Sequence, residues 1–306
     1  MWLPEELDLI ASAQDGLVTR RQALTHGVTV DALRHALGRG GRWQRIVKGV
    51  YATFTGPLQE RHLVRAALLY AGPDAMVTGA TACRAYGMRY VPWSGRPEIL
   101  VPAHVQRARI AIASIRRTRS LPAPRDVRSF PCAPPERAAV DVCRDTRELR
   151  AVRAALCEVV QRRLTTPDEL TVVLASGHSA GSALPRRAVE DIVAGCRSAP
   201  ECELRDLIRN STVLREPRWN EPLPDPRAGD MSPDGCWEEA RLVVEVDSAE
   251  WHHFGDAPEL TERRRARYAS LGWMVLPVSP RRIRDEPHAV LREIESAYLA
   301  GLARAA

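Results

Sequence analysis

Lysine is almost absent from this sequence: of its 44 basic residues Lys48 is the single lysine, and the rest are arginines. No apolar run approaches the roughly 18 residues that a helix needs to cross a bilayer, so we expect no membrane span. The N-terminal stretch MWLPEELDLI is acidic and has no small-residue cleavage site, which argues against a secretory signal. We therefore expect a cytoplasmic protein without a membrane partner.

The cysteines lack the spacings of a structural framework. There are seven of them, an odd number, and no pair is spaced as Cys-x-x-Cys. This pattern argues against a disulfide scaffold and against a zinc ribbon, and it predicts reduced thiols.

Charge is distributed unevenly along the chain. Residues 1–197 carry 29 basic and 18 acidic residues, a net charge of +11, whereas residues 198–306 carry 15 and 20, a net of −5. The basic part predicts a docking surface for a polyanion. The alternative is that the positive charge reflects only an arginine-rich composition and that this surface binds no polyanion.

Helix-start signals recur in the first 56 residues. Thr19 is followed three residues later by Gln22, which is the signature of a capping box, and Thr29 is placed to cap a further helix. The apolar stripe of that further helix is predicted to be Val30, Leu33 and Leu37.

The stretch RWQRIVKGVYATF predicts two short strands that turn at Lys48 and Gly49. Helices followed by such a hairpin predict a winged helix-turn-helix over residues 1–56. Its DNA-contacting side chains would be Arg34 and His35 on the second helix of the motif, and Arg42, Arg45 and Lys48 on the wing. We expect double-stranded DNA as the partner, with the helix in the major groove and the wing on phosphates. A winged helix used for protein contacts is the alternative.

The segment GLVTRRQALTHGVTVDALRHALGRGGRWQRIVKGVYA resembles the N-terminal winged-helix domain of AbiEi-type antitoxins of type IV toxin–antitoxin systems. The resemblance covers roughly the first 55 residues and continues weakly through residues 77–88. It implies operator binding, transcription regulation and a cognate toxin as a partner.

Residues 57–197 predict an α/β middle domain of less definite type. A cluster of arginines flanks one predicted strand there: Arg107, Arg109, Arg116, Arg117 and Arg119. These side chains would either contact phosphates or protect an edge strand by charge, and the sequence favours neither interpretation.

Residues 198–306 predict the order helix, strand, strand, strand, helix, strand, helix, and hence a mixed sheet flanked by helices. The segments SPDGCW and RLVVEVD are predicted to form an antiparallel hairpin, because the connection between them is too short for a crossover helix. Asp234 would then approach Glu245 and Asp247, which share one face of the second strand. Carboxylates so placed repel one another unless a cation is present, and oxygen ligands suit Mg²⁺ or Mn²⁺.

The element order and the PD…EVD residues resemble the PD-(D/E)xK nuclease superfamily, in the branch related to very-short-patch-repair endonucleases. The resemblance covers about 100 residues. It implies catalytic carboxylates at Asp234, Glu245 and Asp247, which would bind the metal ion, and His252 as a base or a packing residue. It also implies an acid on the leading helix, with Glu203 the first choice and Glu201 the alternative.

The sequence departs from this nuclease pattern at one essential place. Asp247 stands where such enzymes usually have a lysine, two residues after Glu245. Arg264 shares a helical stripe with Tyr268, so it is predicted to point inward, either replacing the missing cation or pairing with the acids for stability alone.

Two functional hypotheses follow from these patterns. The first is a DNA-binding regulator of AbiEi antitoxin type with a nuclease-like domain, and the second is an active Mg²⁺-dependent endonuclease targeted by the winged helix. The predicted fold is α/β multidomain: a winged helix-turn-helix (1–56), an α/β middle domain (57–197) and a restriction-endonuclease-like domain (198–306). A protein-interaction module is a third, less specific hypothesis.

Overall fold

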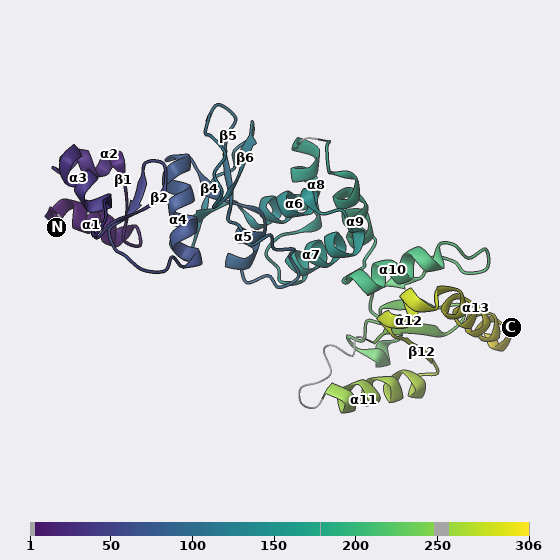
Figure 1. Cartoon of the computed structure of the whole chain (residues 1–306). Helices are drawn as coiled ribbons and strands as arrows, with labels where there is room; N and C mark the ends of the chain where they lie inside the picture. Colours follow the sequence, from purple (N-terminus) through teal and green to yellow (C-terminus); the bar gives the residue numbers. More distant parts are fainter. Residues whose placement is uncertain (1–3, 178, 248–256, 306) are drawn as a thin grey trace. The chain divides into compact units, whose positions relative to one another are not determined.

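A computed structural model describes residues 4–177, 179–247 and 257–305 of the chain (Figure 1). The fold is mixed α/β, and the chain separates into two compact units. The first unit comprises Met1–Thr146 and Leu164–Ser182, and the second comprises Arg147–Arg163 and Ala183–Ala306. The predicted middle segment is thus divided between the two units. Each unit is described by itself below.

The N-terminal elements of the first unit alternate helices with short strands. They are α1 (Glu5–Ala13), β1 (Leu17–Thr19), α2 (Arg20–Thr25), α3 (Val30–Leu37), β2 (Gln44–Val47) and β3 (Val50–Ala52). The strands form an antiparallel sheet in the order β1-β3-β2. The predicted helices and the hairpin that turns at Lys48 and Gly49 are confirmed, whereas the pairing of β1 with β3 was not predicted.

Local capping explains where α2 and α3 begin. Thr19 accepts a hydrogen bond from the Gln22 backbone, and the Gln22 side chain accepts one from the Thr19 backbone, which completes the predicted capping box. Thr29 caps α3 by accepting from the backbone of Ala32. The predicted inner stripe of α3 is wrong at its first position, because Val30 is 48% exposed.

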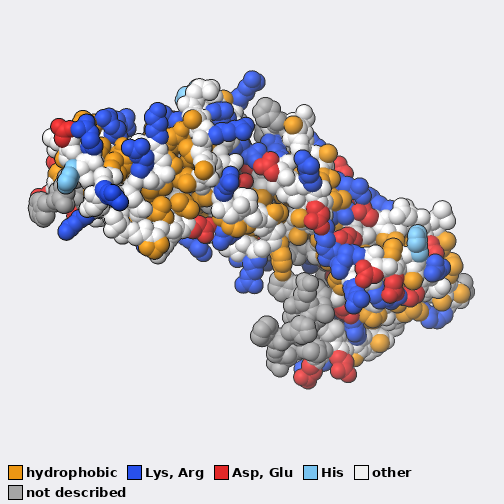
Figure 2. Space-filling view, in the orientation of Figure 1, with side chains coloured by type: hydrophobic (Ala, Val, Ile, Leu, Met, Phe, Trp, Pro, Cys, Tyr) orange, Lys and Arg blue, Asp and Glu red, His pale blue; other side chains and the backbone are white. Residues whose placement is uncertain are grey.

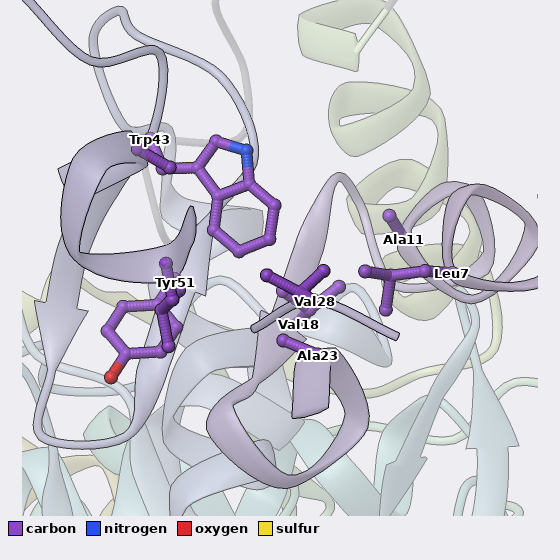
Figure 3. Packing of buried hydrophobic residues seen from close by; sticks show 9 residues of the cluster. Leu7, Ala11, Val18, Ala23, Val28, Trp43 and Tyr51 are labelled. Atoms are coloured by element: carbon purple, nitrogen blue, oxygen red, sulfur yellow. The ribbon is translucent and has the colours of Figure 1, made fainter. Parts of the chain in front are cut away.

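A cluster of buried apolar side chains holds the N-terminal helices against the sheet (Figure 3). Leu7 from α1, Val18 from β1 and Tyr51 from β3 meet there, and the Trp43 ring lies 6.5 Å from the Tyr51 ring, centroid to centroid. The same cluster contains Leu33 of α3. Because one face of α3 packs here, its opposite face is left to solvent.

The rest of the first unit is built on a five-stranded sheet in the order β6-β5-β4-β8-β7. Its elements are α4 (Glu60–Ala71), β4 (Met76–Val77), α5 (Gly79–Ala85), β5 (Glu98–Pro102), β6 (Ser114–Thr118), β7 (Arg125–Val127), β8 (Phe130–Cys132), α6 (Pro135–Asp145) and α8 (Pro167–Ser176). Arg116 and Arg117 lie on β6, at one edge of the sheet. Both interpretations of the arginine cluster place it at an edge strand, so this position agrees with either of them.

The second unit contains a four-stranded mixed sheet in the order β12-β11-β10-β9. Its elements are α7 (Leu149–Gln161), α9 (Ala183–Val193), α10 (Ala199–Ile208), β9 (Arg218–Trp219), the 3₁₀ turn η1 (Pro226–Ala228), β10 (Gly235–Trp237), β11 (Leu242–Val246), α11 (Ala257–Ser270), β12 (Met274–Val278), α12 (Pro280–Asp285) and α13 (Pro287–Ala305). In Figure 1, α11 lies on one side of this sheet and α10 and α13 on the other.

The order of elements predicted for residues 198–306 is confirmed up to β12, after which two helices, α12 and α13, stand where one was predicted. Strands β10 and β11 form the predicted antiparallel hairpin, and β11 pairs with β12 in parallel, with α11 in the connection. Strand β12 lies at the edge of the sheet, and Pro277 on it is exposed.

No disulfide joins any of the seven cysteines, and all of them are buried. Among the described residues, no helix is long and apolar enough to span a membrane.

Candidate functional site

The N-terminal candidate DNA interface consists of side chains on the solvent face of α3 and on the β2–β3 hairpin. Arg34 and His35 are exposed on α3, as predicted, because Leu33 and Ala36 occupy its packed face. Arg34 donates to Asp31 at 2.8 Å, but both side chains are largely exposed, so this pair holds the guanidinium only weakly.

The hairpin adds three further exposed cations, Arg42, Arg45 and Lys48. Gly49 completes the turn with a φ of +82°, a conformation that glycine adopts without strain. On the face drawn in Figure 2, Lys and Arg side chains gather along the upper margin of the first unit. The structure thus presents all five predicted nucleic-acid-binding side chains to solvent.

The carboxylate cluster of the second unit forms around the β10–β11 hairpin. Gly235 pairs with Val244, and this register sets Asp234 across from Glu245. Asp234 Oδ2 accepts a hydrogen bond from the Val246 backbone at 2.7 Å. The hairpin therefore brings Asp234 and Glu245 together, as the sequence predicted.

Burial and mutual repulsion make these two carboxyl groups weaker acids than they are in water. Burial, reinforced by the neighbouring Glu201 carboxylate, raises the pKa of Asp234 to about 7. Burial, reinforced by Asp234, likewise raises the pKa of Glu245 to about 7. Both groups would therefore be partly protonated near neutral pH.

Arg264 of α11 reaches this cluster, as the helical stripe predicted. Its Nη2 lies 3.2 Å from Glu245 Oε1 and 2.7 Å from the Ser232 carbonyl oxygen, to which it donates. The same guanidinium lies 3.1 Å from the Tyr268 hydroxyl, one helical turn later. Its positive charge lowers the pKa values of Asp234 and Glu245, although burial outweighs this effect.

A second arginine, Arg265, forms an ion pair with Asp247. No sequence signal indicated this partner for Asp247. The Asp247 backbone N–H donates to the Val278 carbonyl at 3.0 Å, which fixes it beside the end of β12. Consequently, Glu245 and Asp247 each have their own arginine.

The three predicted metal ligands, Asp234, Glu245 and Asp247, are not arranged around one common point in this structure. Among the described residues, no set of three or more His, Cys, Asp or Glu side chains is arranged to hold a metal ion. Two of the carboxylates contact guanidinium groups, and Asp234 is bonded to the backbone. Asp234, Glu245 and Asp247 therefore do not fit Mg²⁺ or Mn²⁺ in this arrangement, and the metal binding implied by the nuclease resemblance stays untested.

Glu203 does not join the cluster, so the first choice for the acid on the leading helix is corrected. Its carboxylate accepts from Arg150 Nη1 at 2.6 and 2.7 Å. The alternative, Glu201, is the acid whose charge raises the pKa of Asp234.

Glu201 is buried, and both of its carboxylate oxygens already accept hydrogen bonds. It accepts from the Ser198 hydroxyl at 2.7 Å, the Arg197 backbone at 2.8 Å and the Asn220 side chain at 2.6 Å. It therefore joins the cluster electrostatically while serving α10 as a capping residue. His252, the predicted base, lies outside the described residues.

Comparison with known proteins gives no functional assignment. No protein-family model matches the chain. The uncharacterized protein Rv2248 of Mycobacterium tuberculosis (strain ATCC 25618 / H37Rv) is 29% identical over 174 residues, covering 55% of this chain and 63% of its own length. The uncharacterized protein MT2308 of strain CDC 1551 / Oshkosh gives the same values. The chain thus spans 63% of the length of these curated relatives.

Among solved structures, the crystal structure of the RV2827C protein from Mycobacterium tuberculosis aligns with a TM-score of 0.45 at 18% identity. The alignment covers 62% of this chain and 76% of that protein. A likeness at this level carries no argument about fold or function.

Proposed function

We propose that this chain is a double-stranded DNA-binding regulator, and that α1 to β3 form a winged helix-turn-helix. The observation that carries the proposal is the solvent face of α3, where Arg34 and His35 stand next to the cationic hairpin with Arg42, Arg45 and Lys48. A helix with one packed and one cationic face suits the major groove, and a hairpin with cations at its turn suits the adjacent phosphates.

The charge distribution supports the same proposal. The net charge of +11 on residues 1–197 is of the sign that a DNA-binding surface needs, whereas residues 198–306 carry −5. The N-terminal region also resembles AbiEi-type antitoxins. On that resemblance, we propose more particularly that the protein represses its own operator and has a cognate toxin as a second partner.

The second unit, in this proposal, carries a PD-(D/E)xK-like domain that does not cut DNA. Support comes from Arg264 and Arg265, because they bind the carboxylates that a catalytic metal would need. A cation fixed to the chain would neutralise the acids without activating water.

The alternative is a Mg²⁺-dependent endonuclease, and one observation favours it. Asp234 and Glu245 keep raised pKa values even with Arg264 beside them, so their repulsion is only partly relieved. Carboxylates that still repel one another bind a divalent cation readily if the guanidinium groups move away from them.

DNA binding is tested with the full chain and a labelled duplex, by fluorescence anisotropy across a series of salt concentrations. The triple variant Arg42→Ala/Arg45→Ala/Lys48→Ala should bind more weakly. It should also show a shallower dependence of log K on log salt, by about 0.9 for each phosphate that the variant no longer neutralises.

The matched control removes three exposed arginines of the second unit, Arg284, Arg292 and Arg304. Its affinity and salt dependence should equal those of the wild type. An equal weakening of binding in the two triple variants would show non-specific charge attraction and would remove the basis for the winged-helix proposal.

A further inference from the structure

The first unit contains a cavity of about 490 Å³ that the DNA-binding and nuclease-like proposals do not use. It is lined by residues of α4, α5, β4, the β7–β8 hairpin and the turn that follows α1. Its volume falls within the range of small-molecule sites, roughly 300 to 1,000 Å³. All of the lining residues belong to the same compact unit.

Four arginines line this cavity, and two of them already have acidic partners. Arg84 donates to Glu60 at 2.9 Å, and Arg65 donates to Asp15 at 2.9 Å. The other two are Arg61 of α4 and Arg128 of the β7–β8 hairpin. Within the described part of the chain, neither of these two has an ion-pair partner, so the lining carries an excess of two positive charges.

Apolar groups supply part of the lining between these charges. Val64 and Val77 are buried at the wall, and the Phe130 ring lies under the Arg65 guanidinium, 4.5 Å from ring centroid to Cζ. Burial raises the pKa of the Cys132 thiol to about 11, so this side chain is neutral and brings no charge to the wall. An inorganic anion would use the guanidinium groups but leave this apolar surface bare.

The loop that carries Arg128 is strained. Val127 pairs with Phe130, which leaves a two-residue turn in which Arg128 has a φ of +51° and Ser129 a φ of +67°. Such turns normally take asparagine and glycine, because other side chains are crowded there. Arg65 Nη2 donates to the Ser129 carbonyl at 3.0 Å, so a second cavity arginine holds the turn in place. Backbone strain that the surroundings maintain is characteristic of ligand sites.

We infer that this cavity binds a small molecule that carries both a phosphate group and a planar ring, of the mononucleotide class. Arg61 and Arg128 would donate to the phosphate, since a guanidinium can bind two phosphate oxygens at once. The ring would lie against the partly exposed Phe130 side chain, with Val64 and Val77 buried behind the wall.

The full chain is tested by isothermal titration calorimetry with the purine and pyrimidine nucleoside monophosphates, the corresponding nucleosides, and inorganic phosphate. We expect at least one monophosphate to bind about tenfold more tightly than its nucleoside and than phosphate alone. The proposal is overturned if no monophosphate binds, or if phosphate binds as tightly as every monophosphate. It is also overturned if a DNA duplex occupies the cavity and displaces them.

Two variants of Arg128 locate the binding. Arg128→Gln removes the charge, and Arg128→Gly removes it while suiting the positive φ, so the second variant should fold at least as well as the wild type. Both should weaken monophosphate binding by about tenfold or more. The control is Arg119→Gln, at an exposed arginine of the same unit, which should leave it unchanged. Unchanged binding in a folded Arg128→Gly protein would place the ligand elsewhere. None of these measurements depends on DNA binding, so the two proposals can fail separately.

Discussion

Arg264 and Glu245 lie 3.2 Å apart, Nη2 to Oε1, between α11 and β11. Glu245 is mostly buried, whereas the Arg264 side chain is 44% exposed, so the pair joins a buried acid to a partly solvated cation. The arginine therefore limits the cost of the buried carboxylate without abolishing it.

Replacing Arg264 by alanine should lower the melting temperature more at about pH 8 than at about pH 5. At the higher pH Glu245 and Asp234 are ionised and lose their nearest cation, whereas at the lower pH protons neutralise them. Thermal unfolding of the variant at several pH values measures this. The control is Arg263→Ala, because Arg263 is exposed and pairs with Glu259 on its own helix. Equal effects in the two variants would mean that Arg264 acts as an ordinary surface residue.

Asp234 should make the protein less stable as the pH rises from about 4 to about 7. Its pKa in the folded state is about 7, above the ordinary value of 3.8, so the folded state binds more protons than the unfolded chain over this interval. Stability from this group is therefore present below the unfolded pKa and is lost as the pH passes through the folded pKa.

The variant Asp234→Asn should reduce that loss, because its side-chain oxygen can still accept from the Val246 backbone and it carries no charge. Urea unfolding of the wild type and the variant between about pH 4 and about pH 8 provides the comparison. Parallel stability curves for the two proteins would contradict the raised pKa.

Addition of Mg²⁺ or Mn²⁺ should leave the wild-type melting temperature nearly unchanged. The reason is that Arg264 and Arg265 already form ion pairs with Glu245 and Asp247. In the double variant Arg264→Ala/Arg265→Ala the acids lack these cations, and the metal should raise the melting temperature by mass action. Adding Glu245→Ala to the double variant should remove that rise. A rise in the wild type, together with plasmid cleavage, would support the endonuclease alternative.

Arg34→Ala should reduce binding to a selected DNA sequence by about 1–3 kcal/mol, with a smaller effect on binding to unrelated duplex, because a major-groove side chain reads base edges. The target is obtained by selection from a random library with the wild-type protein. The hairpin variant Lys48→Ala is the comparison and should weaken both complexes alike. If both substitutions act uniformly on all sequences, α3 is not the element that reads the bases.

Local signals determined the elements of the N-terminal region. The capping box of Thr19 and Gln22, the cap at Thr29 and the turn at Lys48 each depend on residues a few positions away, so they could be predicted from the sequence. The exposure of Arg34 followed from the period of α3. The pairing of β1 with β3 joins residues more than 30 positions apart, and no local signal reports it.

Of the carboxylate cluster, only the part that the β10–β11 hairpin brings together could be predicted from the sequence. A short connection forces β10 and β11 to pair, which places Asp234 beside Glu245. Glu201 and Glu203, however, are two residues apart and project to nearly opposite sides of α10, so the docking of the helix decides which one approaches.

The sequence by itself determined the capped helices and the hairpin of the N-terminal region, and that Asp234 and Glu245 meet. Tertiary structure alone decided that Arg265 pairs with Asp247, that Glu203 turns to Arg150, and that Arg61 and Arg128 line one cavity. The physical reason is that a long arginine side chain can reach many partners, and only the packing of distant elements selects one of them.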